Sequence, residues 1–133
     1  MSGLEFDYYH KIDKASNIVR WGSEIVHIPY LHPWKTDKNN NRRMAKYWVD
    51  VYLESTSGQK YLIELKPNKE IKALNESKAP KMTKNKKKKT YIHQMQYYTM
   101  NQAKWKAASQ YAHERGWHFI CLGENDIDRI GLL

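Results

Sequence analysis

The chain has 133 residues, which is enough for one domain but too short for two. No apolar run approaches the roughly 20 residues that a membrane helix needs, and the lone cysteine, Cys121, excludes an internal disulfide and fits a reducing compartment. The net charge of +9 favours a polyanionic partner. We therefore expect a single domain over 1–133 that spans no membrane and binds a polyanion.

Hydrophobic periodicity predicts two helices and four strands. In chain order they are a helix over 4–14, strands over 24–30, 46–54 and 59–66, a helix over 90–115 and a strand over 117–122. Pro29 and Pro33 are expected to end the first strand, and Gly116 lies where the long helix should stop. A polar loop is expected over 35–43 and a basic loop over 68–90. The order α-β-β-β-α-β predicts an α/β fold with a mixed central sheet flanked by helices.

The turn between the two middle strands predicts how their side chains face each other. A three-residue loop over 56–58, with glycine in the left-handed position, places Ser55 opposite Gln59. Counting back along both strands then pairs Asp50 with Glu64 on one face of the sheet, with side-chain roots roughly 5 Å apart. Lys66 lies two residues beyond Glu64 and shares that face.

The opposite face of this hairpin is apolar and is expected to pack on the core. Its members are Tyr47, Val49, Val51, Leu53, Tyr61, Ile63 and Leu65. A slip of one residue would bury the charged side chains instead, so the register is well specified. Two opposed carboxylates repel each other, and a divalent cation with oxygen ligands would offset that cost. The alternative is a surface salt bridge between Glu64 and Lys66 beside a solvated Asp50.

Asp50, followed by Glu64-Leu65-Lys66 on the next strand, resembles the motif of the PD-(D/E)xK nuclease superfamily, although Val49 stands where the motif has proline. The superfamily core has the same order of elements. From Leu4 to Leu122 the chain is also similar to the head completion nucleases of T-even-type tailed phages. The segments that carry this likeness are Trp21-Gly22-Ser23-Glu24 with Ile28-Pro29-Tyr30, Ile63-Glu64-Leu65-Lys66-Pro67, and Asn101-Gln102-Ala103-Lys104-Trp105-Lys106-Ala107-Ala108. Transposon-end-cutting endonucleases have a similar core.

The resemblance implies a restriction-endonuclease-like fold and a metal-dependent DNA nuclease that hydrolyses phosphodiester bonds. Asp50, Glu64 and the Leu65 carbonyl would hold Mg²⁺ or Mn²⁺. Lys66 would orient or deprotonate the attacking water, or stabilise the phosphorane oxygens. The first helix of such enzymes supplies an acidic residue, which Glu5 matches and which could help to hold a second metal.

Two further features of the sequence extend this comparison. Glu24, at the start of the first predicted strand, is a second candidate for the acidic residue. The spacing Gln94-x-x-x-Tyr98 resembles a motif of exonucleases in the same superfamily, and four residues on a helix place both side chains on one face. These two residues are expected to assist the reaction, although tyrosine at helical spacing is also typical of a core position.

Positive charge is concentrated in one segment of the chain. Residues 68–90 contain nine lysines and two glutamates, which gives +7 of the +9 net charge. We expect the DNA backbone to be gripped by this segment and by the polar loop, through Lys84, Lys86, Lys87, Lys88, Lys89, Arg42 and Arg43. A solvated lysine loop without a ligand is the alternative.

The resemblance also implies phage head or packaging proteins as partners, and a location in the host cytoplasm or the virion. It favours cutting at DNA ends or structures without strong sequence specificity. The sequence leaves three points open. They are whether the enzyme is an endonuclease or an exonuclease, whether it binds one metal ion or two, and its oligomeric state, for which a dimer is one alternative. Two other functions are considered: a non-catalytic DNA-binding structural protein of the phage particle, and a sequence-specific restriction or transposon-end endonuclease.

Overall fold

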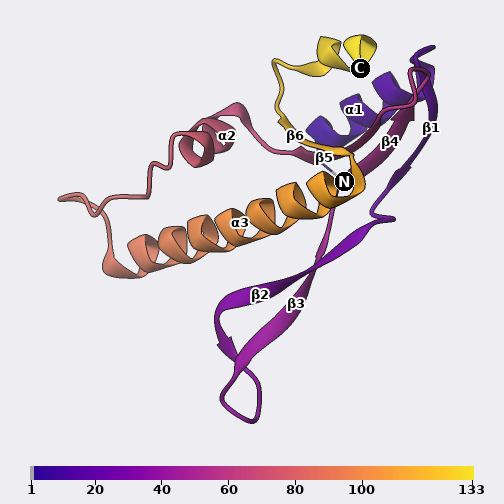
Figure 1. Cartoon of the computed structure of the whole chain (residues 1–133). Helices are drawn as coiled ribbons and strands as arrows, with labels where there is room; N and C mark the ends of the chain where they lie inside the picture. Colours follow the sequence, from indigo (N-terminus) through magenta and orange to yellow (C-terminus); the bar gives the residue numbers. More distant parts are fainter. Residues whose placement is uncertain (1) are drawn as a thin grey trace.

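The computed structural model describes residues 2–133, which form two sheets flanked by helices (Figure 1). The elements in chain order are α1 (Gly3–Lys14), β1 (Ile18–Ser23), β2 (His27–Thr36), β3 (Arg42–Trp48), β4 (Val51–Ser55), β5 (Lys60–Leu65), α2 (Asn68–Asn75), α3 (Lys88–Arg115), β6 (His118–Leu122) and the 3-10 helix η1 (Ile127–Leu132). Within residues 2–133, no helix combines the length and apolar character needed to cross a membrane.

The main sheet has the strand order β1-β4-β5-β6, with β6 parallel to β5 and the other neighbours antiparallel. The elements α1, β1, β4, β5, α3 and β6 follow one another as the predicted α-β-β-β-α-β core, so the predicted fold class is confirmed. The strands β2 and β3 form a separate antiparallel ribbon that projects from the main sheet (Figure 1). This ribbon is an addition to the predicted core.

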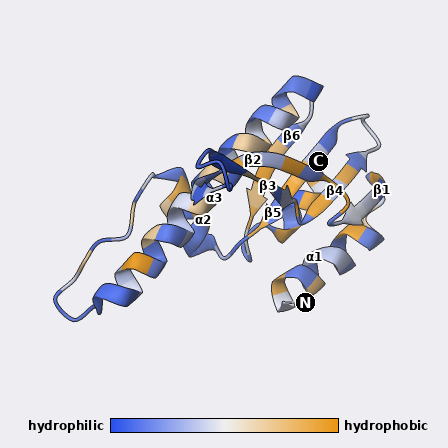
Figure 2. Ribbon diagram, turned by 90° about the horizontal axis from the view of Figure 1, so that it is seen from below, coloured by the Kyte–Doolittle hydropathy of each residue, from blue (hydrophilic) through white to orange (hydrophobic). Residues whose placement is uncertain are grey.

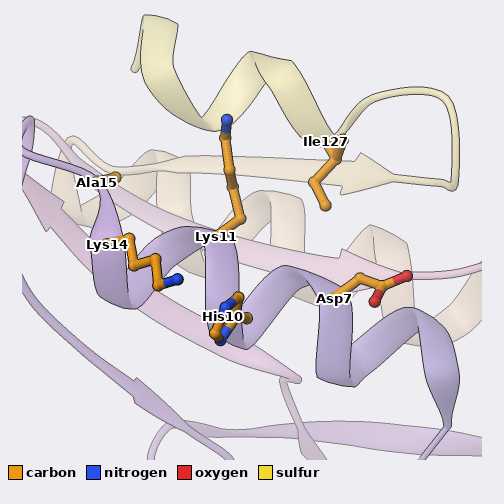
Figure 3. A pocket seen from close by; sticks show the side chains of 6 residues that line it. All are labelled: Asp7, His10, Lys11, Lys14, Ala15 and Ile127. Carbon is orange, nitrogen blue, oxygen red and sulfur yellow. The ribbon is translucent and has the colours of Figure 1, made fainter.

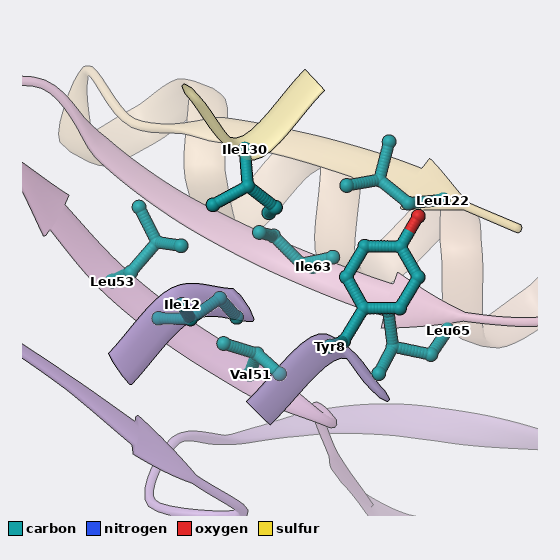
Figure 4. Packing of buried hydrophobic residues seen from close by; sticks show 8 residues of the cluster. All are labelled: Tyr8, Ile12, Val51, Leu53, Ile63, Leu65, Leu122 and Ile130. Atoms are coloured by element: carbon teal, nitrogen blue, oxygen red, sulfur yellow. The ribbon is translucent and has the colours of Figure 1, made fainter. Parts of the chain in front are cut away.

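One face of the main sheet packs against α1 and η1 (Figure 4). The buried side chains on this side are Tyr8, Ile12, Val51, Leu53, Ile63, Leu65, Leu122 and Ile130. Full burial of each large apolar side chain contributes about 1.5–3 kcal/mol. The Tyr8 hydroxyl is satisfied because it donates to the Gly123 carbonyl at 2.6 Å. In Figure 2 the strands of this sheet carry much of the hydrophobic colour, whereas the start of α3 is hydrophilic.

The other face of the main sheet packs against α3 and the ribbon. Its buried members are Ile28, Tyr30, Tyr47, Val49, Leu62, Ala108 and Ala112. The two alanines let the helix backbone approach the sheet closely, because they carry only a methyl group. Gly116 ends α3 in the left-handed conformation, with φ of 71°, as the sequence predicts. Both faces of the sheet are therefore covered.

The predicted strand over 24–30 is wrong in extent. The chain forms β1 before it and then β2, which continues through Pro29 and Pro33 to Thr36. A two-stranded ribbon has two open edges, where the missing N–H of proline costs little. The predicted loop over 35–43 shortens accordingly to the turn that joins β2 to β3.

The predicted strand over 46–54 is interrupted at Val49 and Asp50. The Val49 N–H donates to the Val26 carbonyl at 3.1 Å, and the Asp50 carbonyl accepts from the Glu24 N–H at 3.1 Å. These bonds turn the chain from the ribbon into the main sheet. As a result Tyr47 and Val49 pack on the α3 side, not on the α1 side with Val51 as the unbroken strand predicts.

The predicted loop over 68–90 is wrong at both of its ends. Residues 68–75 form α2, and α3 begins at Lys88. The α2 segment, Asn-Lys-Glu-Ile-Lys-Ala-Leu-Asn, consists mostly of good helix formers, and its apolar side chains lie three residues apart. The run of lysines conceals this short amphipathic pattern.

Candidate active site

Asp50, which directly precedes β4, lies opposite Glu64 of β5, as the sequence predicts. The β4–β5 register pairs Val51 with Ile63 and Glu54 with Lys60, and Gly58 has a φ of 86° in the connecting turn. Continuing that register by one step sets Asp50 opposite Glu64. The Asp50 Oδ2 atom accepts a hydrogen bond from the Leu65 N–H at 2.8 Å, which fixes the aspartate against the end of β5.

Glu64 is buried, with 7% of its surface exposed, because α3 covers its side of the sheet. Burial and the neighbouring Asp50 charge raise its pKa to about 8, and burial also raises the pKa of Asp50. The Tyr47 hydroxyl donates to the Glu64 Oε2 atom. Tyr47 was missed as a site residue because the predicted strand places it on the opposite face.

Lys66 lies directly after β5 and is held by α3. Its Nζ donates to the Tyr97 hydroxyl at 2.7 Å and lies 4.9 Å from the centre of the Tyr97 ring. Burial by itself lowers the pKa of Lys66, but the Tyr97 hydroxyl and the Glu64 charge outweigh it and raise the pKa above its ordinary value. Lys66 therefore remains an ammonium ion beside the two carboxylates.

A second lysine, Lys104, approaches the carboxylates from α3. Its Nζ lies 5.6 Å from the centre of the Tyr47 ring, the same ring whose hydroxyl binds Glu64. Burial lowers the pKa of Lys104, and the charges of Glu64 and Asp50 act in the opposite direction. The sequence offers one signal for this residue, its place in the segment 101–108 that resembles the phage nucleases.

The two candidates for a third acidic residue lie on different elements. Glu5 is in the first turn of α1, where its N–H is capped by the Ser2 hydroxyl at 3.1 Å. Glu24 follows β1 with a φ of 53°, and its charge contributes to the raised pKa of Asp50. Burial raises the pKa of Tyr9, and the charges of Glu5, Asp50 and Glu24 raise it further. Glu24 is thus electrostatically linked to Asp50 directly.

The oxygen donors at this site suit a hard divalent cation. Across residues 2–133, no three His, Cys, Asp or Glu side chains lie close enough together to hold a metal ion. Asp50 and Glu64 nevertheless form a carboxylate pair whose pKa values are raised, chiefly by burial, although the Lys66 charge acts in the opposite direction. A divalent cation between two such carboxylates favours their ionised form. The pair and the adjacent backbone carbonyl of Leu65 are candidate oxygen donors, and Glu24 is the acidic residue whose charge acts on Asp50.

The Gln94 and Tyr98 side chains form hydrogen bonds with residues other than Asp50, Glu64 and Lys66. Among the described residues, Gln94 accepts from the Lys86 Nζ at 2.7 Å and Tyr98 accepts from the Gln102 amide at 2.7 Å. It is the neighbouring Tyr97 that reaches Lys66. Helical spacing indicates which residues share a face of α3, but it does not indicate which of them meets β5.

The predicted DNA-binding residues lie on two separate surfaces. Lys84, Lys87, Lys88 and Lys89 are exposed around the start of α3, and Lys86 is half-buried. Tyr97 follows Lys88 by nine residues, which is about 14 Å along a helix axis. The second surface is the ribbon, where Arg43 is exposed and the Arg42 guanidinium donates to the His32 carbonyl at 3.2 Å.

A separate hollow of about 410 Å³ lies between α1 and η1 (Figure 3). It is lined by Asp7, His10, Lys11, Lys14, Ala15 and Ile127. Lys11 forms an ion pair with Asp128 of η1 at 3.7 Å. Its lining comes from α1, the residue that follows it and η1, and contains neither Asp50 nor Glu64, so this hollow is distinct from the candidate active site.

A mixed sheet flanked by helices, with an aspartate at one strand and Glu-x-Lys on the next, defines a PD-(D/E)xK nuclease. A family model described as TnsA-like endonuclease N terminal matches residues 15–124, and the chain belongs to this family. The chain is also 31% identical over 130 residues to the head completion nuclease of Enterobacteria phage T4. The aligned region covers 98% of this chain and 81% of the phage T4 protein. No solved structure matches the chain. The predicted family is confirmed.

Proposed function

We propose that this chain is a Mg²⁺- or Mn²⁺-dependent DNA nuclease that acts during completion of a phage head. The observation that carries the proposal is the buried Glu64 of β5 with the half-buried Asp50 opposite it, just before β4, and the Lys66 ammonium beside them. The similarity to a phage head completion nuclease supports the biological setting. Phage head or packaging proteins are then its partners, and the host cytoplasm or the virion is its location.

Asp50, Glu64 and the Leu65 carbonyl are the proposed metal ligands. When bound, a divalent cation supplies Lewis-acid activation of water and of the phosphodiester. The chain contributes the orientation of the ligands: the Leu65 N–H fixes one oxygen of Asp50, and the Tyr47 hydroxyl fixes one oxygen of Glu64. The second oxygen of each carboxylate is the one proposed to bind the cation.

Lys66 acts in this proposal as a charged group rather than as a base. A lysine serves as a general base only where its site lowers its pKa, and here the pKa is raised. Its ammonium would stabilise negative charge that develops on the phosphorane oxygens. Lys104, whose Nζ lies 5.6 Å from the centre of the Tyr47 ring, would add a second positive charge near the same phosphate.

The remaining predicted residues are assigned supporting roles. Glu5 and Glu24 are the candidates for a third acidic residue, and Gln94 and Tyr98 assist less directly. Phosphate contacts along the DNA are assigned to Lys84, Lys86, Lys87, Lys88, Lys89, Arg42 and Arg43. Phosphate contacts position DNA without reading its sequence, which supports cutting at ends or structures.

The proposal is tested by incubating the protein with linear, circular and single-stranded DNA in Mg²⁺, Mn²⁺ or chelator. We expect cleavage only with metal, and its loss in Asp50→Asn, Glu64→Gln and Lys66→Ala with DNA affinity within about threefold of the unchanged protein. Asp128→Asn, in the surface ion pair with Lys11, is the matched control and keeps full activity. Near-normal turnover in Asp50→Asn would overturn the assignment.

The same assay separates the two rival functions. DNA binding without cleavage in any divalent metal would favour a structural DNA-binding protein of the particle. Cleavage at one defined sequence would favour a restriction or transposon-end type of endonuclease. Comparison of circular with linear substrates distinguishes endonuclease from exonuclease action.

A further inference from the structure

A cavity of about 410 Å³ lies between α2 and α3. Ala73 and Leu74 of α2 contribute apolar lining, and Tyr97 and Tyr98 of α3 contribute aromatic rings. Three lysines also line it, among them Lys78, whereas Glu70 is the one acidic residue in its lining. The cavity therefore combines flat aromatic groups with a net positive charge.

The cavity also contains a polar group that the protein leaves unsatisfied. Asn101 lines it and is 3% exposed, and its Nδ2 has no hydrogen-bond partner among residues 2–133. A buried donor without an acceptor costs about 1–3 kcal/mol of stability. A ligand in the cavity that offers an acceptor would remove this cost.

The cavity adjoins the candidate active site through Tyr97. The Tyr97 hydroxyl accepts from Lys66 Nζ at 2.7 Å, and Tyr97 is itself part of the cavity lining. Lys66 is the first residue after β5, the strand that contains Glu64. A ligand in the cavity would consequently lie one side chain away from the phosphate that Lys66 is proposed to contact.

We propose that this cavity binds one unpaired nucleotide of the DNA strand that is cut, next to the scissile phosphate. The inference rests on the proposed nuclease function and specifies its substrate. The base would stack on the tyrosine rings, the Asn101 amide would donate to a base acceptor, and the lysines would neutralise the phosphate. Every nucleobase has a π-face and an acceptor on its edge, so the pocket favours an unpaired nucleotide without selecting its identity.

A volume of about 410 Å³ suits a single nucleotide, in the range of small-molecule sites, and excludes a base pair within a duplex. A base inside a duplex enters such a pocket only after it has left its stack, which costs a few kcal/mol. Terminal, overhanging and single-stranded nucleotides avoid that cost. The cavity thus gives a physical reason for preferring DNA ends and frayed structures.

Binding can be tested without cleavage. A blunt duplex and the same duplex with a one-nucleotide overhang of 2-aminopurine are titrated with protein in the presence of chelator, while anisotropy and 2-aminopurine fluorescence are recorded. We expect the overhang to raise affinity about tenfold, which lies within the range for stacking of one base on aromatic side chains. A change in 2-aminopurine fluorescence should accompany binding as the overhanging base moves into the pocket.

Three variants and one control locate the effect. Ala73→Phe fills the cavity and Tyr98→Ala removes a stacking ring, so each should abolish the overhang preference while blunt-duplex affinity stays within about threefold. Ala79→Phe adds the same bulk to an exposed neighbouring position outside the lining and should behave like the unchanged protein. Asn101→Leu should also weaken overhang binding but leave the free protein equally or more stable, since it removes an unsatisfied buried donor.

The opposite results overturn the inference. Equal affinity for blunt and overhanging duplexes, or an overhang preference that survives both Ala73→Phe and Tyr98→Ala, would show that the cavity does not hold the nucleotide. Because these measurements are made in chelator, they do not depend on the metal chemistry. A protein that never cleaves but keeps the overhang preference would refute the nuclease function and leave the nucleotide site in place.

Discussion

Glu64 makes the stability of the metal-free protein depend on pH. Its carboxyl is buried beside Asp50, and its pKa is raised from 4.5 to about 8 in the folded chain. A raised carboxyl pKa means that the folded state binds the proton more tightly than the unfolded state. The contribution of Glu64 to the free energy of unfolding is therefore complete below about pH 4.5 and is lost as the pH rises towards 8.

The size of the effect follows from the shift. A change from 4.5 to about 8 corresponds to about 5 kcal/mol, as an order of magnitude, which is a large part of the 5–15 kcal/mol that stabilises a typical domain. For a domain of this size, the unfolding temperature in chelator should fall by about 10 °C or more between pH 5 and pH 9. The raised pKa of Asp50 acts in the same direction.

Differential scanning calorimetry at several pH values, with chelator or with Mg²⁺, measures this dependence. Mg²⁺ should flatten the decline at high pH, because it binds the ionised carboxylates of the folded state. Glu64→Gln removes the titrating group but retains an acceptor for Tyr47, so in chelator it should be more stable than the unchanged protein at pH 8 to 9. The exposed Glu114→Gln is the control and should keep the original slope.

The reasoning would be refuted by an unfolding temperature in chelator that stays constant or rises from pH 5 to pH 9. It would also be refuted if Glu64→Gln retained the slope of the unchanged protein. Either result would show that Glu64 is not the buried group that binds the proton.

Other perturbations test the remaining parts of the site. Tyr97→Phe should lower single-turnover cleavage about tenfold with little change in DNA affinity, because Lys66 loses one hydrogen bond to a charged group; an unchanged rate would show that this bond does not position Lys66. Alanine at all four lysines over 86–89 should flatten the plot of log affinity against log salt by up to about four units, at roughly 0.9 for each lysine that contacts a phosphate; an unchanged slope would identify a solubilising segment. Glu24→Gln should raise the Mg²⁺ concentration for half-maximal activity more than Glu5→Gln does, because Glu24 acts directly on the pKa of Asp50; the reverse order would assign the third acidic residue to α1.

Short-range rules of sequence were sufficient for the central hairpin. The sequence predicts that Asp50 faces Glu64, because Gly58 takes a positive φ in the turn and the side chains alternate along both strands. The observed β4–β5 register agrees with this prediction. The long helix and its end at Gly116 followed from periodicity and the left-handed conformation of glycine. These features depend on residues close together in the chain.

The surroundings of the acid pair were decided by tertiary structure. Tyr47 meets Glu64 only because the chain breaks at Asp50 and the ribbon turns to the α3 side. Tyr97, and not Tyr98, reaches Lys66, because the position of α3 against the sheet sets which side of the helix faces β5.

The same packing buries Glu64 and raises its pKa to about 8. The sequence shows the charged residues of the site, but it is this burial that makes the pair favour a bound cation. The sequence by itself determined which carboxylates and which ammonium group stand together. Their burial and their hydrogen-bond partners come from segments 17 and 31 residues away, whose approach depends on how a helix packs on a sheet and not on any local pattern.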